Sequence, residues 1–326
     1  RANSYSRPDS TSCMQILVTG ATGFVGSNLV DALLAADHEV TILTRSRERY
    51  DGPEEVTVVE GNVLEPGSFD DALDVDLAYY LIHSMGAGGD YAERDRRAAR
   101  NFSEAASDAD IDRVVYLGGL GADRDNLSPH LRSRREVERI LGLGEYDLTV
   151  LRAAIIIGAG SISFQLIRQL AGRLPVMITP KWVHTECQPI AIDDVIGYLV
   201  GVAEIPETAG ETYEIGGPDV LTYAEILKET RRQLGGRLRI VPVPVLTPRL
   251  SSWWIRFVTD VDPAVARPLI DGVKNSVVVT DTRIQELLPR DRLPFEAAVA
   301  DALATEPTGS PTPKARLGRL LRGSKP

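Results

Sequence analysis

GATGFVG, residues Gly20–Gly26, is the stretch that decides the fold of this chain. It follows a short apolar and β-branched run at residues 15–19 (QILVT), which has the composition of a buried parallel strand. After it, apolar residues recur from Phe24 to Leu34 with the spacing of one helix face. The bare glycine spacing is weak evidence, but its position between a strand and a helix is typical of a phosphate-binding loop.

Each glycine of this loop has its own expected role. Gly20 permits a tight turn off the strand, Gly23 lets the backbone approach a pyrophosphate, and Gly26 allows the helix to pack close to the sheet. The free N–H groups and the positive dipole end of the helix would bind the phosphates. We therefore predict a dinucleotide site whose phosphate loop contains Gly20, Thr22, Gly23, Phe24, Val25 and Gly26.

The end of the next predicted strand, Glu39–Thr44, bears on the choice of dinucleotide. An NAD site usually has an acidic residue here, which bonds the ribose 2′-hydroxyl. This chain instead has Arg45, Ser46 and Arg47, and a guanidinium with a hydroxyl suits a 2′-phosphate. The pattern favours NADP(H) over NAD(H); the alternative is that the arginines are merely solvated.

Asn62 and Val63 follow a third predicted strand, Val56–Glu60. Folds of this kind often place a polar side chain against the adenine at this point. We expect Asn62 to bond the adenine amine and Val63 to pack on the ring. A simple turn role for Asn62 is the alternative.

Strands and helices alternate through residues 14–157, which predicts a Rossmann-type, doubly wound parallel α/β sheet that forms a dinucleotide-binding core. The further elements of this core are expected at residues 77–82, 91–109, 113–117, 133–143 and 148–157. The regularity fails after Gly158. We expect residues 158–303 to form a small substrate lobe and to close the fold with a strand at Val277–Val279 and a helix at Phe295–Leu303.

The two ends of the chain lie outside this predicted fold. Residues 1–13 are expected to be a disordered leader or a remnant of cloning. Residues 304–326 form a basic tail, for which we weigh disorder against contact with a membrane surface or a partner.

Composition narrows the classes of function. A formal net charge of −10 argues against nucleic acid as the main partner. The chain has 2 cysteines, Cys13 and Cys187, too few for a disulfide framework, so we expect a reduced, cytoplasmic location. Asp193 and Asp194 enter a predicted helix and are expected as N-terminal helix charges rather than metal ligands. The expected partner is a small-molecule substrate, and the oligomeric state is not predicted.

Several segments together resemble the short-chain dehydrogenase/reductase superfamily, and within it the atypical, NmrA-like branch of NAD(P)H-binding proteins. The resemblance covers nearly all of residues 14–303. The segments that carry it are VTGATGFVGS (18–27), HSMG (83–86), ERDRRAARNF (93–102), YLGGLG (116–121), LSPHLRSRREVE (127–138), LRAAIIIG (151–158), QPIAIDDV (188–195) and ARPLIDGVKN (266–275).

The resemblance implies a nicotinamide that lies across the ends of the fourth to sixth strands. Leu81, Ile82 and His83 would then line the cofactor ribose, and Gly118 and Gly119 would lie beside the nicotinamide.

The chain departs from the superfamily in its catalytic residues. Catalytic members use a serine, a tyrosine and a lysine, but this sequence contains no Tyr-x-x-x-Lys. The resemblance places His130 at the tyrosine position, Arg134 at the lysine position, and Gly118 or Gly119 at the serine position. Ser133 and Glu136 read as a capping box at the start of the predicted helix.

Three hypotheses follow from this departure. In the first, His130 donates the proton with Arg134 beside it, since histidine titrates near neutrality. In the second, a conjugated or quinone-like acceptor takes its proton from water or from a group such as His83 or Tyr91. In the third, the chain binds NADP(H) without catalysis, as a redox sensor or a scaffold subunit. The first two predict an oxidoreductase that acts on a small or lipophilic organic acceptor.

Overall fold

A computed structural model describes residues 13–84, 91–121, 127–173, 175–243 and 259–305. Its centre is a parallel sheet of 7 strands in the order β11-β6-β5-β4-β1-β2-β3. The strands are β1 (Gln15–Thr19), β2 (Glu39–Thr44), β3 (Thr57–Glu60), β4 (Leu77–Tyr80), β5 (Arg113–Gly119), β6 (Asp147–Ala153) and β11 (Thr212–Ile215). The predicted Rossmann-type fold is confirmed.

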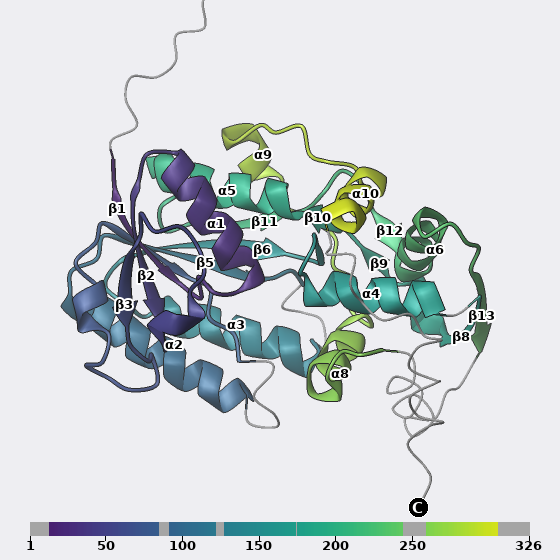
Figure 1. Ribbon diagram of the computed structural model, residues 1–326, viewed down its shortest axis with the longest axis horizontal. Helices are drawn as coiled ribbons and strands as arrows, with labels where there is room; N and C mark the ends of the chain where they lie inside the picture. Colours follow the sequence, from purple (N-terminus) through teal and green to yellow (C-terminus); the bar gives the residue numbers. More distant parts are fainter. Residues whose placement is uncertain (1–12, 85–90, 122–126, 174, 244–258, 306–326) are drawn as a thin grey trace, which may run out of the picture.

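Helices cover both faces of this sheet (Figure 1). α1 (Phe24–Ala35) and α5 (Ile192–Glu204) pack on one face, and α2 (Tyr91–Asp108) and α3 (Pro129–Leu141) pack on the other. Ile16, Leu17 and Val18 of β1 are fully buried as a result, which explains why this strand is a continuous apolar run rather than an alternating one.

The remaining elements form a lobe beside the carboxyl edge of the sheet (Figure 1). Its helices are α4 (Ile162–Arg173), α6 (Tyr223–Gln233), α8 (Pro263–Gly272) and α10 (Phe295–Thr305). Three small strand pairs join them: β7 (Ile156–Ile157) with β10 (Ile190–Ala191), β9 (Glu186–Cys187) with β12 (Leu221–Thr222), and β8 (Val176–Pro180) with β13 (Arg239–Val243). α9 (Arg283–Leu287) lies near β11. No helix in the described part of the chain is long and apolar enough to cross a membrane.

The predicted start of α3 was wrong. The helix begins at Pro129, where Ser128 is the N-cap and its hydroxyl accepts from the Leu131 N–H at 3.3 Å. Ser133 is therefore a buried residue inside the helix, and the predicted capping box with Glu136 does not form.

Two predicted strands also differ. Residues 148–157 form β6 and β7, which belong to different sheets, because the chain leaves the main sheet after Ala153. Val277 makes an isolated bridge to Cys187 where a strand at Val277–Val279 was predicted. The predicted helix at Phe295–Leu303 is confirmed as α10. The leader and the basic tail lie outside the described residues apart from Cys13, Ala304 and Thr305.

Candidate functional site

The phosphate loop has the geometry that a pyrophosphate requires. Gly20 has a φ of +73°, and a Cβ there would lie 2.9 Å from the carbonyl oxygen of Leu81. A Cβ on Gly26 would lie 2.3 Å from the Gly20 carbonyl oxygen. Only glycine fits at these two positions. The loop is thus a backbone cradle that abuts the end of β4.

The start of α1 leaves donors for an anion. Gly23 is the N-cap, makes no side-chain capping bond, and has no acidic residue in the turn that follows. The first N–H groups of a helix have no partner within the helix, and the helix dipole makes this end positive. These features fit the diphosphate of a dinucleotide.

Two arginines follow β2, but one of them is already engaged. The Arg47 guanidinium donates to the Val58 carbonyl at 2.7 Å and so links the turn after β2 to strand β3. Arg45 is exposed and makes no hydrogen bond or ion pair with any residue that the structure describes. Ser46 donates its N–H to the Thr44 hydroxyl at 3.4 Å. Arg45 is therefore the arginine available to a ligand at this edge.

Asn62 has a local role in the structure. Its amide donates to Glu65 Oε1 at 2.8 Å, and its Oδ1 accepts from the Leu64 N–H at 3.2 Å. These bonds close a turn, as the alternative role predicts. Val63 is 7% exposed and packs into the core below. Contact of either residue with adenine stays a prediction.

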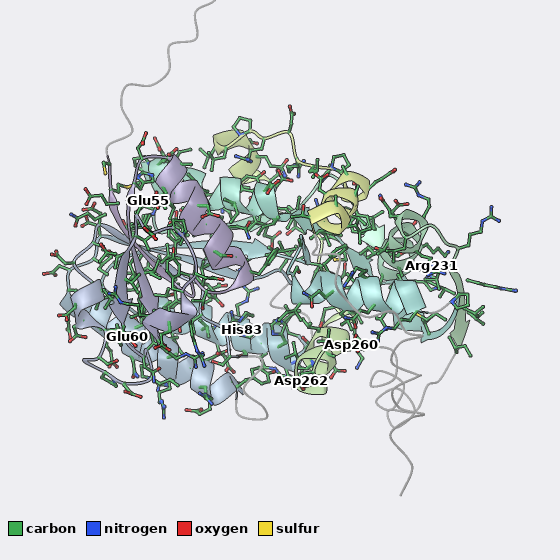
Figure 2. The ribbon with its side chains drawn as sticks, viewed as in Figure 1. Glu55, Glu60, His83, Arg231, Asp260 and Asp262 are labelled. Carbon is green, nitrogen blue, oxygen red and sulfur yellow. The ribbon has the colours of Figure 1, made fainter. Side chains whose placement is uncertain are left out.

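A buried polar cluster lies past the end of β4, where the resemblance implied the cofactor ribose. His83 Nδ1 lies 3.0 Å from Asp95 Oδ2, and the Ser84 N–H donates to Asp95 Oδ1 at 2.9 Å. Arg134 of α3 donates to Asp95 Oδ2 at 3.1 Å. Figure 2 shows His83 near the centre of the molecule, between the sheet and the lobe that carries Arg231.

Burial and the contacts within this cluster determine the protonation states of His83 and Asp95. Burial, and then the charge of Arg134, lowers the pKa of His83 to about 4 in spite of its hydrogen bond to Asp95. Burial opposes ionisation of Asp95, but the hydrogen bond from His83 and the charge of Arg134 hold its pKa below the usual value. At neutral pH the cluster is a neutral imidazole beside an Asp95–Arg134 ion pair.

His130 lies beside this cluster, on α3 one helical turn before Arg134. Its ring centroid is 5.2 Å from that of His83. Burial, followed by the nearby His83 and Arg134, lowers the pKa of His130 to about 3. The structure thus brings together all three predicted catalytic residues, His83, His130 and Arg134, and leaves both histidines neutral at pH 7.

Close packing surrounds Gly118 and Gly119, the two glycines at the position of the superfamily's serine. A Cβ on Gly119 would lie 2.8 Å from Leu131 Cδ2, and one on Gly118 would lie 3.1 Å from Tyr116 Cε1. Gly119 therefore allows α3 to approach β5 closely, whereas the close neighbour of Gly118 is Tyr116 of the same strand. Neither position carries a hydroxyl in place of the serine.

A cavity of about 480 Å³ adjoins the cluster. His83, His130 and Arg134 form its polar wall, and the ends of β5 and β6 form its floor. The rest of the lining is almost entirely apolar and comes from the lobe. This volume lies within the range of roughly 300–1,000 Å³ that is usual for small-molecule sites.

Sequence reasoning missed Asp95, the residue that joins the cluster. Asp95 is 2% exposed and lies on the inward face of α2 with Ala98, Ala99 and Phe102. The signal was available, because an acidic residue at a core-facing helical position needs a partner. The surrounding ERDRR segment is so highly charged that Asp95 did not stand out in the sequence as a core-facing residue.

Comparisons with known proteins agree with an NAD(P)H-binding fold. Residues 20–169 match the family described as NAD(P)H-binding. A photosystem II assembly factor from Synechocystis is 27% identical over 75% of this chain and 75% of its own length. The 40 kDa subunit of mitochondrial NADH-ubiquinone oxidoreductase from Neurospora crassa is 25% identical over 73% of this chain and 66% of its own length. A ceramide reductase from Caulobacter vibrioides is 27% identical over 70% of this chain and 73% of its own length.

Solved structures share the fold at lower identity. A nucleoside-diphosphate-sugar epimerase from Staphylococcus aureus superposes with a TM-score of 0.71 at 17% identity, over 88% of this chain and 100% of that one. The enzyme WbmG from Bordetella bronchiseptica, in complex with NAD, gives 0.67 at 18% identity, over 91% and 94%. The chain carries an NAD(P)H-binding domain, and its homologues belong to the atypical, NmrA-like family of short-chain dehydrogenases/reductases.

Proposed function

We propose that this protein is an NADP(H)-dependent oxidoreductase that acts on an apolar organic carbonyl, alcohol or conjugated acceptor. One observation carries the proposal. His83, His130 and Arg134 form the polar wall of an otherwise apolar cavity, and the buried Asp95 bonds both His83 and Arg134. This wall lies at the sheet edge where a Rossmann fold binds the reacting end of its cofactor.

The preference for NADP(H) is supported by Arg45. Its exposed guanidinium lies at the end of β2 without a partner in the described chain, and none of the three residues directly after that strand is a carboxylate that could bind a free 2′-hydroxyl. Arginine recognises phosphate oxygens through charge-assisted bonds in a planar fork. Arg47 is less suited to this role because it is bonded to Val58.

His83 is the group best placed to move a proton. Asp95 is ionised, so the neutral imidazole donates Nδ1–H to it and keeps the lone pair on Nε2. Nε2 is buried and has no partner within the described residues. In this form His83 accepts a proton from a substrate hydroxyl, and its protonated form returns one to a developing oxyanion.

Arg134 supplies the fixed positive charge that the superfamily places on lysine. Its guanidinium is 9% exposed, and it is bound to Asp95 through one nitrogen. Nε is buried without a partner in the described chain, so it can donate to a substrate oxygen. Such a preorganised donor stabilises charge that develops at that oxygen. The cofactor, when bound, supplies or accepts the hydride.

The proposal is tested by following NADPH oxidation with a panel of apolar aldehydes, ketones, enones and quinones. We expect turnover with at least one class and its loss in an Arg134→Met variant that still binds NADPH. Tighter binding of NADH than of NADPH would contradict the cofactor assignment. NADPH binding with no turnover across the panel would contradict the assignment as an enzyme.

A second candidate is a non-catalytic NADP(H)-binding regulator or assembly protein. It is favoured by the histidine pKa values of about 4 and 3, which leave neither histidine protonated in advance at neutral pH. The homologues include one protein named as an assembly factor and one named as a respiratory subunit. The same turnover panel separates the two candidates.

A further inference from the structure

We propose that the substrate is an amphiphile with one unbranched hydrocarbon chain and a neutral carbonyl or hydroxyl head. The head would lie against His83 and Arg134, and the chain would lie along α4 inside the lobe. This inference rests on the proposed function for the identity of the reacting end. It adds the class of substrate that the cavity accepts.

The polar wall specifies the head group. Three buried atoms of the polar wall have no partner among the described residues: Nε2 of His83, Nδ1 of His130 and Nε of Arg134. The arginine nitrogen is a donor, and a neutral imidazole offers one acceptor and one donor. A carbonyl or hydroxyl oxygen satisfies this set.

The charge balance of the same wall excludes an acid as the best head group. Asp95 already neutralises Arg134 through a contact of 3.1 Å, in a position where Asp95 is almost fully buried. An added carboxylate would be desolvated there without an unpaired cation to compensate it. We therefore expect a neutral head to bind more tightly than an acidic one.

The lobe specifies the tail. Ser163, Leu166, Ile167 and Leu170 line the cavity from one face of α4, with the spacing of successive helical turns. Seven residues of helix rise about 10 Å, so the cavity extends at least that far along α4. Figure 1 shows α4 running from the sheet edge toward β8.

Other elements of the lobe enclose this path. Ile226 and Leu227 of α6, Leu269, Ile270 and Val273 of α8, and Met177 of β8 complete the apolar lining. The lining thus forms an elongated apolar surface along α4. A cavity of this kind accommodates a hydrocarbon chain laid along the helix.

The polar atoms of the lobe are too few to bind a second polar group of comparable size. The lobe contributes three polar side chains to the lining, from Ser163, Thr179 and Tyr223. The Tyr223 hydroxyl is already hydrogen-bonded to Cys187, whereas the Thr179 hydroxyl is buried without a partner in the described chain. The tail therefore gains its affinity from apolar burial.

The test uses the full chain and a series of unbranched primary alcohols from butanol to dodecanol. Their dissociation constants are measured by displacement of a fluorescent fatty alcohol, below the concentration at which micelles form. We expect affinity to rise about fourfold per methylene, which corresponds to about 0.8 kcal/mol, until the chain fills the cavity. Alcohols should also bind more tightly than carboxylates of the same length.

Leu170 variants test where the tail lies. Leu170→Trp fills the far part of the cavity and should move the plateau to shorter chains, whereas Leu170→Ala should move it to longer ones. Leu143→Trp is the matched control, because Leu143 is 82% exposed and does not line the cavity. Unchanged NADPH affinity in each variant shows that it is folded.

The outcomes separate this inference from the proposed function. Affinity that does not depend on chain length, or Leu170 variants with an unaltered plateau, would overturn the substrate class even if NADPH is oxidised by other acceptors. Tighter binding of the carboxylates would overturn the neutral head. Binding of long-chain alcohols without any turnover would support the substrate class and refute the reductase.

Discussion

A single carboxylate oxygen, Oδ2 of Asp95, lies 3.0 Å from Nδ1 of His83. The same oxygen accepts from the Arg134 guanidinium, so one buried acid fixes both the proton-transfer group and the positive charge of the candidate site. Asp95 acts through these two residues and is therefore a positioning residue. Through Asp95, helix α2 is bonded both to His83, which follows β4, and to Arg134 of α3.

Replacement of Asp95 tests this arrangement. In Asp95→Asn the amide oxygen accepts from Arg134 or from His83 but no longer neutralises the charge of Arg134, and His83 loses its fixed tautomer. We expect kcat to fall by about 100-fold or more, which is the scale of general acid–base catalysis, with little change in the affinity for NADPH. The pH at which the rate of alcohol oxidation declines should also move, which a merely structural role would not cause.

Glu93→Gln is the control for Asp95→Asn. Glu93 lies on the same helix, and its side chain is 65% exposed and bonded to Arg96. Its removal should leave kcat and the pH profile unchanged, because exposed ion pairs contribute little. Equal losses in the two variants would contradict the role of Asp95.

Arg45→Ala tests the cofactor preference. A charge-assisted hydrogen bond contributes about 1.5–3 kcal/mol, so its loss should weaken NADPH binding by about 10- to 150-fold. NADH affinity should stay constant, because that cofactor lacks the 2′-phosphate. Calorimetric titration with both nucleotides measures the change, and Arg49→Ala, an exposed arginine in the same turn, is the control. An equal loss for NADH would refute recognition of the phosphate by Arg45.

The low pKa of His83 predicts a dependence on pH with a definite sign. Because that pKa is about 4, the protonated form becomes about tenfold rarer with each unit of pH above it. If His83 donates the proton, kcat/KM for reduction should rise about tenfold per unit as the pH falls from 7 to 5. Oxidation of the alcohol needs the neutral ring and should be constant over this range. A rate of reduction that is independent of pH would assign the proton to water or to another group.

Gly20→Ala tests the backbone cradle against a matched glycine. Gly20 and Gly67 have φ values of +73° and +82°, so alanine is strained by about 1–2 kcal/mol at either position. Only the Gly20 Cβ meets backbone, at 2.9 Å from the Leu81 oxygen, whereas nothing lies within 4 Å of a Cβ on Gly67. We expect Gly20→Ala to lose a further 1–3 kcal/mol or so in urea unfolding and to bind NADPH at least about tenfold more weakly. Equal effects at the two positions would show that the contact with Leu81 is unimportant.

Local patterns made the first half of the fold predictable. β1, the glycine loop and α1 follow one another directly, and each is defined by residues within a few positions of it. β2 has the bounds that its apolar run indicated.

The features that depend on distant partners were not predictable in this way. β11 pairs with β6, and Thr212 of β11 lies opposite Val150 of β6. No short-range pattern in the sequence indicates such a pairing. The charged helix α3 could be read as solvated surface, yet Arg134 and Arg135 are 8% and 5% exposed. Arg134 is buried because Asp95 lies opposite it, 39 residues earlier in the chain.

Gly20 and Gly26 of the predicted phosphate loop have the geometry expected of them, and phosphate binding by the loop stays a prediction. His83, His130 and Arg134 were named one by one, but their joining through Asp95 was not foreseen. The sequence carries the residue types, whereas their convergence depends on how α2 and α3 pack on the sheet. The apolar cavity was likewise beyond prediction, because its walls come from segments between residues 83 and 277.

The return of the chain from the lobe to β11 has a consequence for the architecture of relatives. Since β11 supplies the outermost strand beside β6, the segment that carries α4 and β8 is looped out of the sheet rather than appended to it. A protein cut after Gly158 would lack this strand and present the backbone of β6 as an open edge, on which other molecules could assemble. Any exchange of the segment that carries α4 and β8 must therefore preserve two junctions with the sheet at once, whereas α6, α8 and α10 of the lobe follow β11 in the chain. Change in this part of the binding lobe is thus tied to the integrity of the sheet.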